Sequence, residues 1–349
     1  MYSKKPNRLL HVDAIRGVTM LLVVYNHIVT FCLPSPCLTE INSILLLFRM
    51  PLFFFISGYF AYNADYTKDL LVKRSINRVV KQFYPTLILW LLCCFIFESA
   101  PIYDWPFDNW KNGYWFTFVS VEIFFIVAPL LCLFFYCRLS RKIQSISLTA
   151  LCLIFVLLHH HYSLSGGWAK WNSLFCLWHL LCYIPFFILG MIVKLHNELF
   201  HKLFRKKWLL FLSTMCFICC IQYPNTPFYR PLSAISAIFT IYSLFFWLYN
   251  TGNRIVNKIF SSMAIIGCST LEIYLIHYFI VYSVRENAYL ECLGAVQNSI
   301  YEFPILLMLS IIICTLCLLA VRLLKYLNVY YLIFPAAYSR KAVKMVYNN

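Results

Sequence analysis

The sequence is poor in charged residues. Only 12% of them are Asp, Glu, Lys or Arg, whereas ordinary soluble domains carry about 25%. Hydrophobic residues make up 62% of the chain, and the mean hydropathy is +0.74. This composition excludes an ordinary soluble protein and predicts a polytopic membrane protein. We also expect no cleavable signal peptide, because the first apolar run is long, carries charges and has no small-residue cleavage site.

Several familiar catalytic signatures are absent from the sequence. It contains no H-E-x-x-H motif, no Cys/His spacing of a zinc site and no G-x-S-x-G elbow. The 16 cysteines are scattered singly or as adjacent pairs inside apolar runs, which is typical of small apolar packing residues. We therefore expect no metal site and no tightly bound cofactor.

Runs of about 20 apolar residues are long enough to cross a bilayer as helices. We predict an all-α membrane bundle with ten such spans, forming a single membrane-embedded domain over residues 1–349 with no appended soluble domain. The predicted spans are 13–33, 43–62, 83–100, 114–137, 143–160, 173–194, 208–222, 232–250, 261–283 and 303–324.

The chain has a net charge of +16, and its basic residues are unevenly distributed between the predicted connections. Most Lys and Arg residues fall at the N-terminus, in the even-numbered connections and in the tail, and the odd-numbered connections hold only Lys111, Lys170, Arg230 and Arg285. Basic loops stay in the cytoplasm, so we expect both termini and every even connection to be cytoplasmic. The charge then reflects membrane orientation and attraction to lipid headgroups, and it indicates no nucleic-acid partner.

The first span carries an unusual polar stripe. Asp13, Arg16 and His27 interrupt an apolar segment, and charges at membrane depth usually face a protein interior or a wet cavity. Arg16 and His27 are almost three helical turns apart, so they share one face at a separation of about 16 Å along the axis. The predicted orientation puts Asp13 and Arg16 at the cytoplasmic boundary and His27 toward the outer leaflet. An interfacial ion pair and a histidine that links two helices would also explain this pattern.

Other predicted spans contain further polar groups. Arg49 lies in the second span, Glu122 in the fourth, and Tyr274 and His277 in the ninth. Arg49 needs a partner or a path to the interface, whereas Ser57-Gly58 is typical of close helix packing. This inventory indicates proton handling, and the residues alone leave open whether it serves an enzyme or a proton-coupled transporter.

Several motifs together resemble the bacterial membrane O-acyltransferases of the acyltransferase-3 family. Asp13, Arg16-Gly17 and His27 are similar to its D-x-x-R-G…H signature, and FRMPLFFFISGYF resembles its second-helix motif. Arg78-Val-Val-Lys81 before Pro85 resembles R-x-x-R-x-x-x-P, with Lys in place of the second Arg. YWFTFVSVEIFF, PFFILGMI and TLEIYLIHYF resemble its later helices. The resemblance covers nearly the whole chain.

The resemblance implies transfer of an acyl group, commonly acetyl from acetyl-CoA as co-substrate, to a carbohydrate hydroxyl in the bacterial cytoplasmic membrane. The acceptor would be a surface polysaccharide or its lipid-linked precursor. Two alternatives remain: a transporter or flippase of a lipid-linked sugar, and the same fold transferring succinyl or another acyl group to a different acceptor. The acceptor can also be a small molecule.

Roles for individual residues follow from this resemblance and from side-chain chemistry. His27 is the candidate base or transient acyl carrier, since histidine suits proton transfer near pH 7. Arg16 and Asp13 are candidates for the same catalytic site, and Arg16 is expected to bind the donor or to orient Asp13. Arg74, Arg78 and Lys81 are the candidate CoA-phosphate site, although their charge also fits topology alone. The candidates for acceptor binding or for tuning His27 are Arg49, Glu122, Tyr274 and His277.

Overall fold

The computed structural model describes residues 9–33, 40–62, 68–97, 108, 110–165, 169–222, 229–285, 294, 296–297 and 299–335. Within these ranges the chain forms helices, turns and bends but no strand, as the predicted all-α class requires. The N-terminal residues 1–8 and the C-terminal residues 336–349, for which we predict a cytoplasmic location, lie outside the described part. The chain divides into two compact units, and α2 (Glu40–Ala61) and α15 (Glu302–Tyr326) contribute to both.

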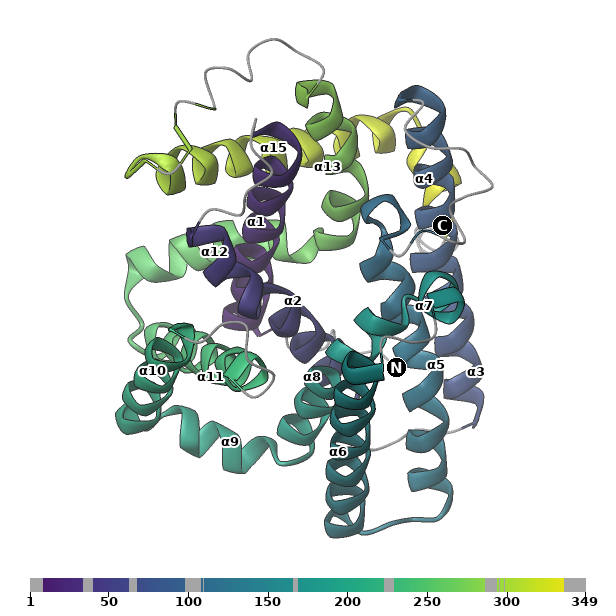
Figure 1. The fold of residues 1–349 in the computed structure, drawn as a ribbon, viewed down its shortest axis with the longest axis vertical. Helices are drawn as coiled ribbons and strands as arrows, with labels where there is room; N and C mark the ends of the chain where they lie inside the picture. The colour runs from purple at the N-terminus through teal and green to yellow at the C-terminus, as the bar shows by residue number, and fades with distance from the viewer. Residues whose placement is uncertain are drawn as a thin grey trace, which may run out of the picture. The chain divides into compact units, whose positions relative to one another are not determined.

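The first unit comprises residues 1–57 and 196–318. Its central helix is α1, which packs against α11, α12 and α13, while α10 packs against α9 and α11 (Figure 1). Besides its parts of α2 and α15, the helices of this unit are α1 (Leu10–Cys32), α9 (Asn197–Phe204), α10 (Lys207–Ile221), α11 (Tyr229–Asn250), α12 (Arg254–Cys268) and α13 (Thr270–Arg285).

The second unit comprises residues 58–195 and 319–349. In it α6 packs against α8, and α5 packs against α3, η1 and α8. Besides its parts of α2 and α15, the helices of this unit are α3 (Lys68–Arg78), the π-helix η1 (Val79–Phe83), α4 (Tyr84–Phe97), the 3-10 helix η3 (Lys111–Gly113), α5 (Trp115–Tyr136), α6 (Arg141–Ser165), α7 (Ala169–Phe175), α8 (Leu177–Leu195) and α16 (Tyr330–Ile333).

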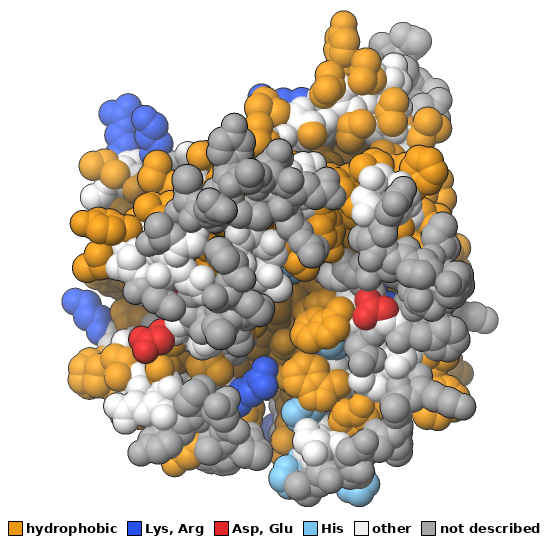
Figure 2. All heavy atoms as spheres, turned by 45° about the horizontal axis from the view of Figure 1, so that its top comes forward, with side chains coloured by type: hydrophobic (Ala, Val, Ile, Leu, Met, Phe, Trp, Pro, Cys, Tyr) orange, Lys and Arg blue, Asp and Glu red, His pale blue; other side chains and the backbone are white. Residues whose placement is uncertain are grey.

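The described residues contain eight helices long and apolar enough to cross a membrane, or nine if one bent pair counts as a single span. Each of the ten predicted segments is mostly helical where it is described, although Cys176 interrupts the sixth between α7 and α8. The count of ten requires α10, which has 15 residues and a length of about 22 Å. Hydrophobic side chains cover much of the described surface visible in Figure 2, and few charged side chains interrupt them. Such a surface faces lipid, and the chain is a multi-pass membrane protein.

The predicted ninth span, 261–283, is wrong as a continuous helix. The structure breaks it at Ser269, and α12 and α13 meet there at 75° (Figure 1). The cause lies in the packing of α12 on α1. A Cβ added at Gly267 would collide with the carbonyl oxygen of Asp13, and one added at Gly17 would collide with that of Met263. The two backbones touch at these glycines, and the chain then turns away to form α13.

The predicted second connection, 63–82, also differs from the structure. Residues 68–83 are helical and continue directly into α4, so that a candidate span runs from Val72 to Phe97. Arg74 and Arg78 therefore lie on α3, and Lys81 lies in the π-helical segment η1. The cause is local: no Gly or Pro separates the basic stretch from the apolar one before Pro85. Short π-helical segments within α-helices occur often at functional sites.

Candidate active site

His27 lies at the centre of an aromatic and imidazole cluster in the first unit. Its Nε2 is 3.1 Å from the hydroxyl of Tyr278, and its ring centroid is 5.0 Å from that of His277. Tyr274 adjoins both residues, with ring centroids 5.8 Å from His277 and 6.2 Å from Tyr278. The structure thus brings three sequence candidates together, because α1 and α13 pack side by side.

The two imidazoles differ in their hydrogen bonds. Nδ1 of His277 lies 3.1 Å from the carbonyl oxygen of Ile273. A carbonyl only accepts hydrogen bonds, so this contact places the proton on Nδ1 and leaves the Nε2 lone pair exposed to the cluster. Within the described residues, Nε2 of His277 and Nδ1 of His27 have no hydrogen-bond partner. Two imidazole nitrogens in one buried cluster are therefore available to exchange protons with a substrate.

Arg49 belongs to a hydrogen-bonded chain that leads to α1. Its Nη1 donates to Oδ1 of Asn42 at 3.3 Å, and Nδ2 of Asn42 donates to Oδ1 of Asn26 at 3.2 Å. Arg49 is buried, so these amides meet the need for a partner that its position in an apolar span created. Asn26 directly precedes His27 in α1, which links the chain to the neighbourhood of the histidine.

The residue-level predictions missed several residues that form side-chain hydrogen bonds on or to α1. Tyr278, Asn26, Asn42 and Thr270 were not among the candidates, and neither was Glu302, whose carboxylate accepts a hydrogen bond from the Tyr25 hydroxyl at 2.9 Å. The sequence does carry a signal for the asparagines and for Glu302, since each is a polar residue within or at the start of a membrane-length apolar run. Tyrosine and threonine give no such signal, because both are common in apolar helices.

Asp13 and Arg16 form a second polar group near the break between α12 and α13. Nη1 of Arg16 is 3.5 Å from Oδ1 of Asp13, and its Nη2 donates to Oγ1 of Thr270 at 2.9 Å. Thr270 is the first residue of α13. Irregular backbone at membrane depth is tolerated where it is buried in protein or lines a cavity. Arg16 and His27 thus both face α13, at its start and about two turns further along it.

A comparison with protein-family models matches an acyltransferase domain, that of the acyltransferase-3 family, over residues 9–319. The chain belongs to the acyltransferase-3 family. It is therefore a membrane acyltransferase, and the resemblance seen in its motifs is confirmed. No curated protein and no solved structure matches the chain.

The basic residues of this acyltransferase that we predict to bind the donor lie in the second unit. Nη1 of Arg78 donates to Oε1 of Gln82 at 2.9 Å, and its guanidinium carbon lies 5.2 Å from the ring centroid of Phe124. Nη1 of Arg74 donates to the carbonyl oxygen of Ala61 at 3.2 Å. Arg74 thus contacts the end of α2, and Arg78 contacts α5.

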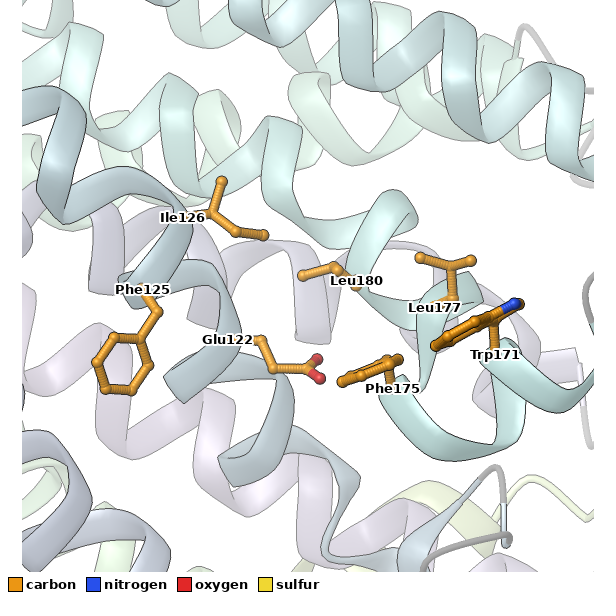
Figure 3. Close-up of a pocket in the computed structure, with 7 residues that line it drawn as sticks. All are labelled: Glu122, Phe125, Ile126, Trp171, Phe175, Leu177 and Leu180. Atoms are coloured by element: carbon orange, nitrogen blue, oxygen red, sulfur yellow. The ribbon is translucent and has the colours of Figure 1, made fainter.

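Glu122 also belongs to the second unit, on α5. Both of its carboxylate oxygens are buried without a hydrogen-bond partner in the described chain. Lys111, which acts electrostatically on Glu122, donates from Nζ to the carbonyl oxygen of Ser173 at 2.5 Å. Burial lowers the pKa of Lys111 below its usual range. Glu122 also lines a pocket, and the other side chains that line this pocket are apolar (Figure 3).

The small-residue interpretation of Gly58 is confirmed. A Cβ at this position would collide with the carbonyl oxygen of Phe187 on α8, so α2 and α8 approach closely here within the second unit. Nζ of Lys194 lies 4.8 Å from the ring centroid of the following Tyr59. The Ser-Gly-Tyr motif therefore has a packing role, which needs no direct part in chemistry.

Proposed function

We propose that this acyltransferase transfers an acyl group, most simply acetyl, from acyl-CoA to a carbohydrate hydroxyl at the bacterial cytoplasmic membrane. The acceptor would be a surface polysaccharide or its lipid-linked precursor. The observation that carries the proposal is the His27, Tyr278 and His277 cluster within an acyltransferase-3 domain. A sugar hydroxyl is a poor nucleophile, and a histidine with a free ring nitrogen supplies the base that it needs.

In the proposed reaction His27 removes the proton from the acceptor hydroxyl as its oxygen attacks the thioester carbonyl. The new C–O bond forms, the C–S bond breaks, and the CoA thiolate receives the proton from the imidazolium. Tyr278 holds the His27 ring through Nε2, so Nδ1 is the nitrogen that faces the substrate. The same nitrogen can instead carry the acyl group transiently, and trapping of an acyl-enzyme would distinguish this route.

Arg16 has a different task in this proposal. Helix α1 is continuous from Leu10 to Cys32, so Arg16 and His27 stay about 16 Å apart along the axis. They cannot act on the same atoms. We assign Arg16, oriented by Asp13 and Thr270, to donor support, and we assign His27 to the chemical step.

The donor phosphates are assigned to Arg74, Arg78 and Lys81 in the second unit. Arginine binds phosphate through a bidentate fork, whereas lysine acts as a point charge. We expect Arg78→Ala to raise the KM for acyl-CoA at least tenfold and Arg78→Lys to restore part of that loss. Equal KM values for wild type and Arg78→Ala would restrict the cluster to a structural or topological role.

The proposed function is tested with labelled acetyl-CoA and membranes that contain His27→Ala, Arg16→Ala or the control Thr30→Ala. Thr30 is exposed on the same helix, one turn after His27. We expect loss of label from the glycan in both active-site variants at equal protein levels and normal label in the control. Wild-type labelling in either active-site variant would overturn the mechanism. A parallel series of acyl-CoA donors, analysed by mass spectrometry, distinguishes acetyl from succinyl or longer groups.

A further inference from the structure

The second unit contains a pocket of about 670 Å³ between α5, α7 and α8. Glu122 lies in its wall, and the other lining side chains are apolar (Figure 3). They are Phe125, Ile126, Trp171, Phe175, Leu177 and Leu180. This volume falls within the range of small-molecule sites. One acidic group in an otherwise apolar pocket restricts the kind of ligand that fits.

The carboxyl group of Glu122 needs a hydrogen-bond donor that the described protein does not supply. Both oxygens are buried without a hydrogen-bond partner in the described residues, and Figure 3 shows the carboxylate directed toward the ring of Phe175 inside the pocket. A buried polar group without a partner costs about 1–3 kcal/mol by mutational data. A plain lipid acyl chain would fill the pocket but leave this cost in place. The favoured ligand therefore carries an N–H or O–H group.

The pocket opens toward lipid. Phe125 and Ile126 are exposed on α5, a helix long and apolar enough to cross the membrane. Trp171 and Phe175 are also exposed at the pocket. A ligand that enters between such side chains comes from the bilayer, so it must itself be partly apolar. A free sugar or CoA in water would have to shed its hydration without replacement.

Two aromatic rings form a flat surface in the pocket wall. Trp171 and Phe175 are stacked, with centroids 5.8 Å apart and an interplanar angle of 12°. Their parallel faces can cover the apolar face of a ring or a chain. The pocket thus combines one hydrogen-bond acceptor with flat apolar walls, which is the complement of an amphipathic, hydroxyl-bearing molecule.

We propose that this pocket binds the acceptor of the acyl transfer as a lipid-linked carbohydrate. One acceptor hydroxyl donates a hydrogen bond to Glu122, and the apolar part of the molecule lies along Phe125, Ile126 and Leu180. Glu122 acts as a positioning residue that accepts this hydrogen bond. This inference rests on the proposed function, because that function is what makes a hydroxyl-bearing glycolipid the substrate.

The test uses a photoactivatable alkyl glucoside with a diazirine in its chain and the purified full chain in lipid nanodiscs. We expect crosslinks on α5 and α7 that are competed by the unlabelled alkyl glucoside but not by an alkane of equal length or by free glucose. Crosslinks that map elsewhere, or competition by the alkane as strong as by the glucoside, would overturn the proposal. Because binding is measured without acyl-CoA, the result does not depend on transfer activity.

Two substitutions at Glu122 sharpen the test. Glu122→Gln keeps a carbonyl that accepts a hydrogen bond, whereas Glu122→Leu removes it at similar volume. We expect at least tenfold weaker competition by the alkyl glucoside for the leucine variant, less than threefold for the glutamine variant, and no change for the control Leu133→Ala, which is exposed on the same helix. Equal competition in wild type and Glu122→Leu would overturn the role of Glu122.

A merely structural role for Glu122 predicts a different result. Replacing an unpartnered carboxyl by leucine removes a buried polar group, so we expect Glu122→Leu to melt at or above the wild-type temperature even though it binds the glucoside more weakly. A lower melting temperature with unchanged competition would assign Glu122 to stability. If wild type transfers no acyl group from acyl-CoA to any glycan, the proposed function fails, whereas the binding result decides the pocket separately.

Discussion

Two residues of α13, Tyr278 and Ile273, each form a hydrogen bond with one of the two clustered histidines. The Tyr278 hydroxyl is hydrogen-bonded to Nε2 of His27, and the carbonyl oxygen of Ile273 accepts a hydrogen bond from Nδ1 of His277. Each imidazole is thereby left with one available nitrogen in the same cluster. A base that is held by one ring nitrogen and reacts through the other keeps a fixed orientation, which lowers the cost of reaching the transition state.

The hydrogen bond between Nε2 of His27 and the Tyr278 hydroxyl can be removed without changing the shape of the site. A neutral hydrogen bond contributes about 0.5–1.5 kcal/mol. We therefore expect Tyr278→Phe to lower kcat about three- to tenfold, with the KM for acyl-CoA unchanged because the residues proposed to bind the donor are untouched. Steady-state kinetics with purified protein measure this. Tyr326→Phe, at an exposed position, serves as the control, and a change in KM alone would contradict the positioning role.

At the scale of elements, α1 packs closely on α12 just before the chain breaks at Ser269. Arg16 contacts the first residue after this break, Thr270. Gly17 and Gly267 let the two backbones meet. The close approach ends at Ser269, and α13 then carries Thr270 to Arg16 and Tyr278 to His27. Small residues at such crossings are typical of membrane helices, where van der Waals packing drives association.

A methyl group at Gly17 tests this packing. It would collide with the carbonyl oxygen of Met263, and overpacking of this kind costs about 1–3 kcal/mol. We expect Gly17→Ala to lower the melting temperature in detergent and to reduce acyl transfer, since α13 follows α12 in the chain. Val18→Ala, at the next and half-buried position, should change the melting temperature less. An unchanged melting temperature in Gly17→Ala would contradict the backbone contact.

At the scale of the whole molecule, the membrane orientation depends on α10. Its length of about 22 Å is shorter than the roughly 30 Å of a bilayer core, so crossing requires local thinning of the bilayer. The distribution of basic residues nevertheless favours a crossing. With α10 inserted, the turn before Arg254 and Lys258 is cytoplasmic, as the positive-inside rule expects.

Reporter fusions test whether α10 crosses the membrane. Alkaline phosphatase fused after Gly252 should be inactive, and green fluorescent protein fused there should fluoresce, because we expect this turn in the cytoplasm. A fusion after Gly113, in the predicted outer connection before α5, should give the opposite pair of results. Active phosphatase after Gly252 would mean that α10 does not cross the membrane, and it would remove the count of ten spans.

The sequence by itself determined the class of this protein and much of its candidate site. Apolar runs predicted the helices because a helix that faces lipid must be apolar along its length. The helical period predicted that Asp13, Arg16 and His27 share a face, and Arg16 and His27 do both contact α13. These features are local, so spacing along one segment is enough to infer them.

Only the tertiary structure decided which distant residues meet. No local pattern distinguishes Tyr278 as the partner of His27, or Asn42 as the partner of Arg49, because each pairing depends on how two helices pack. The break at Ser269 has the same origin, since it follows the contact of Gly267 with α1. Likewise, the sequence shows Glu122 only as a polar residue in an apolar run, whereas the structure places it in the wall of a pocket with α7 and α8.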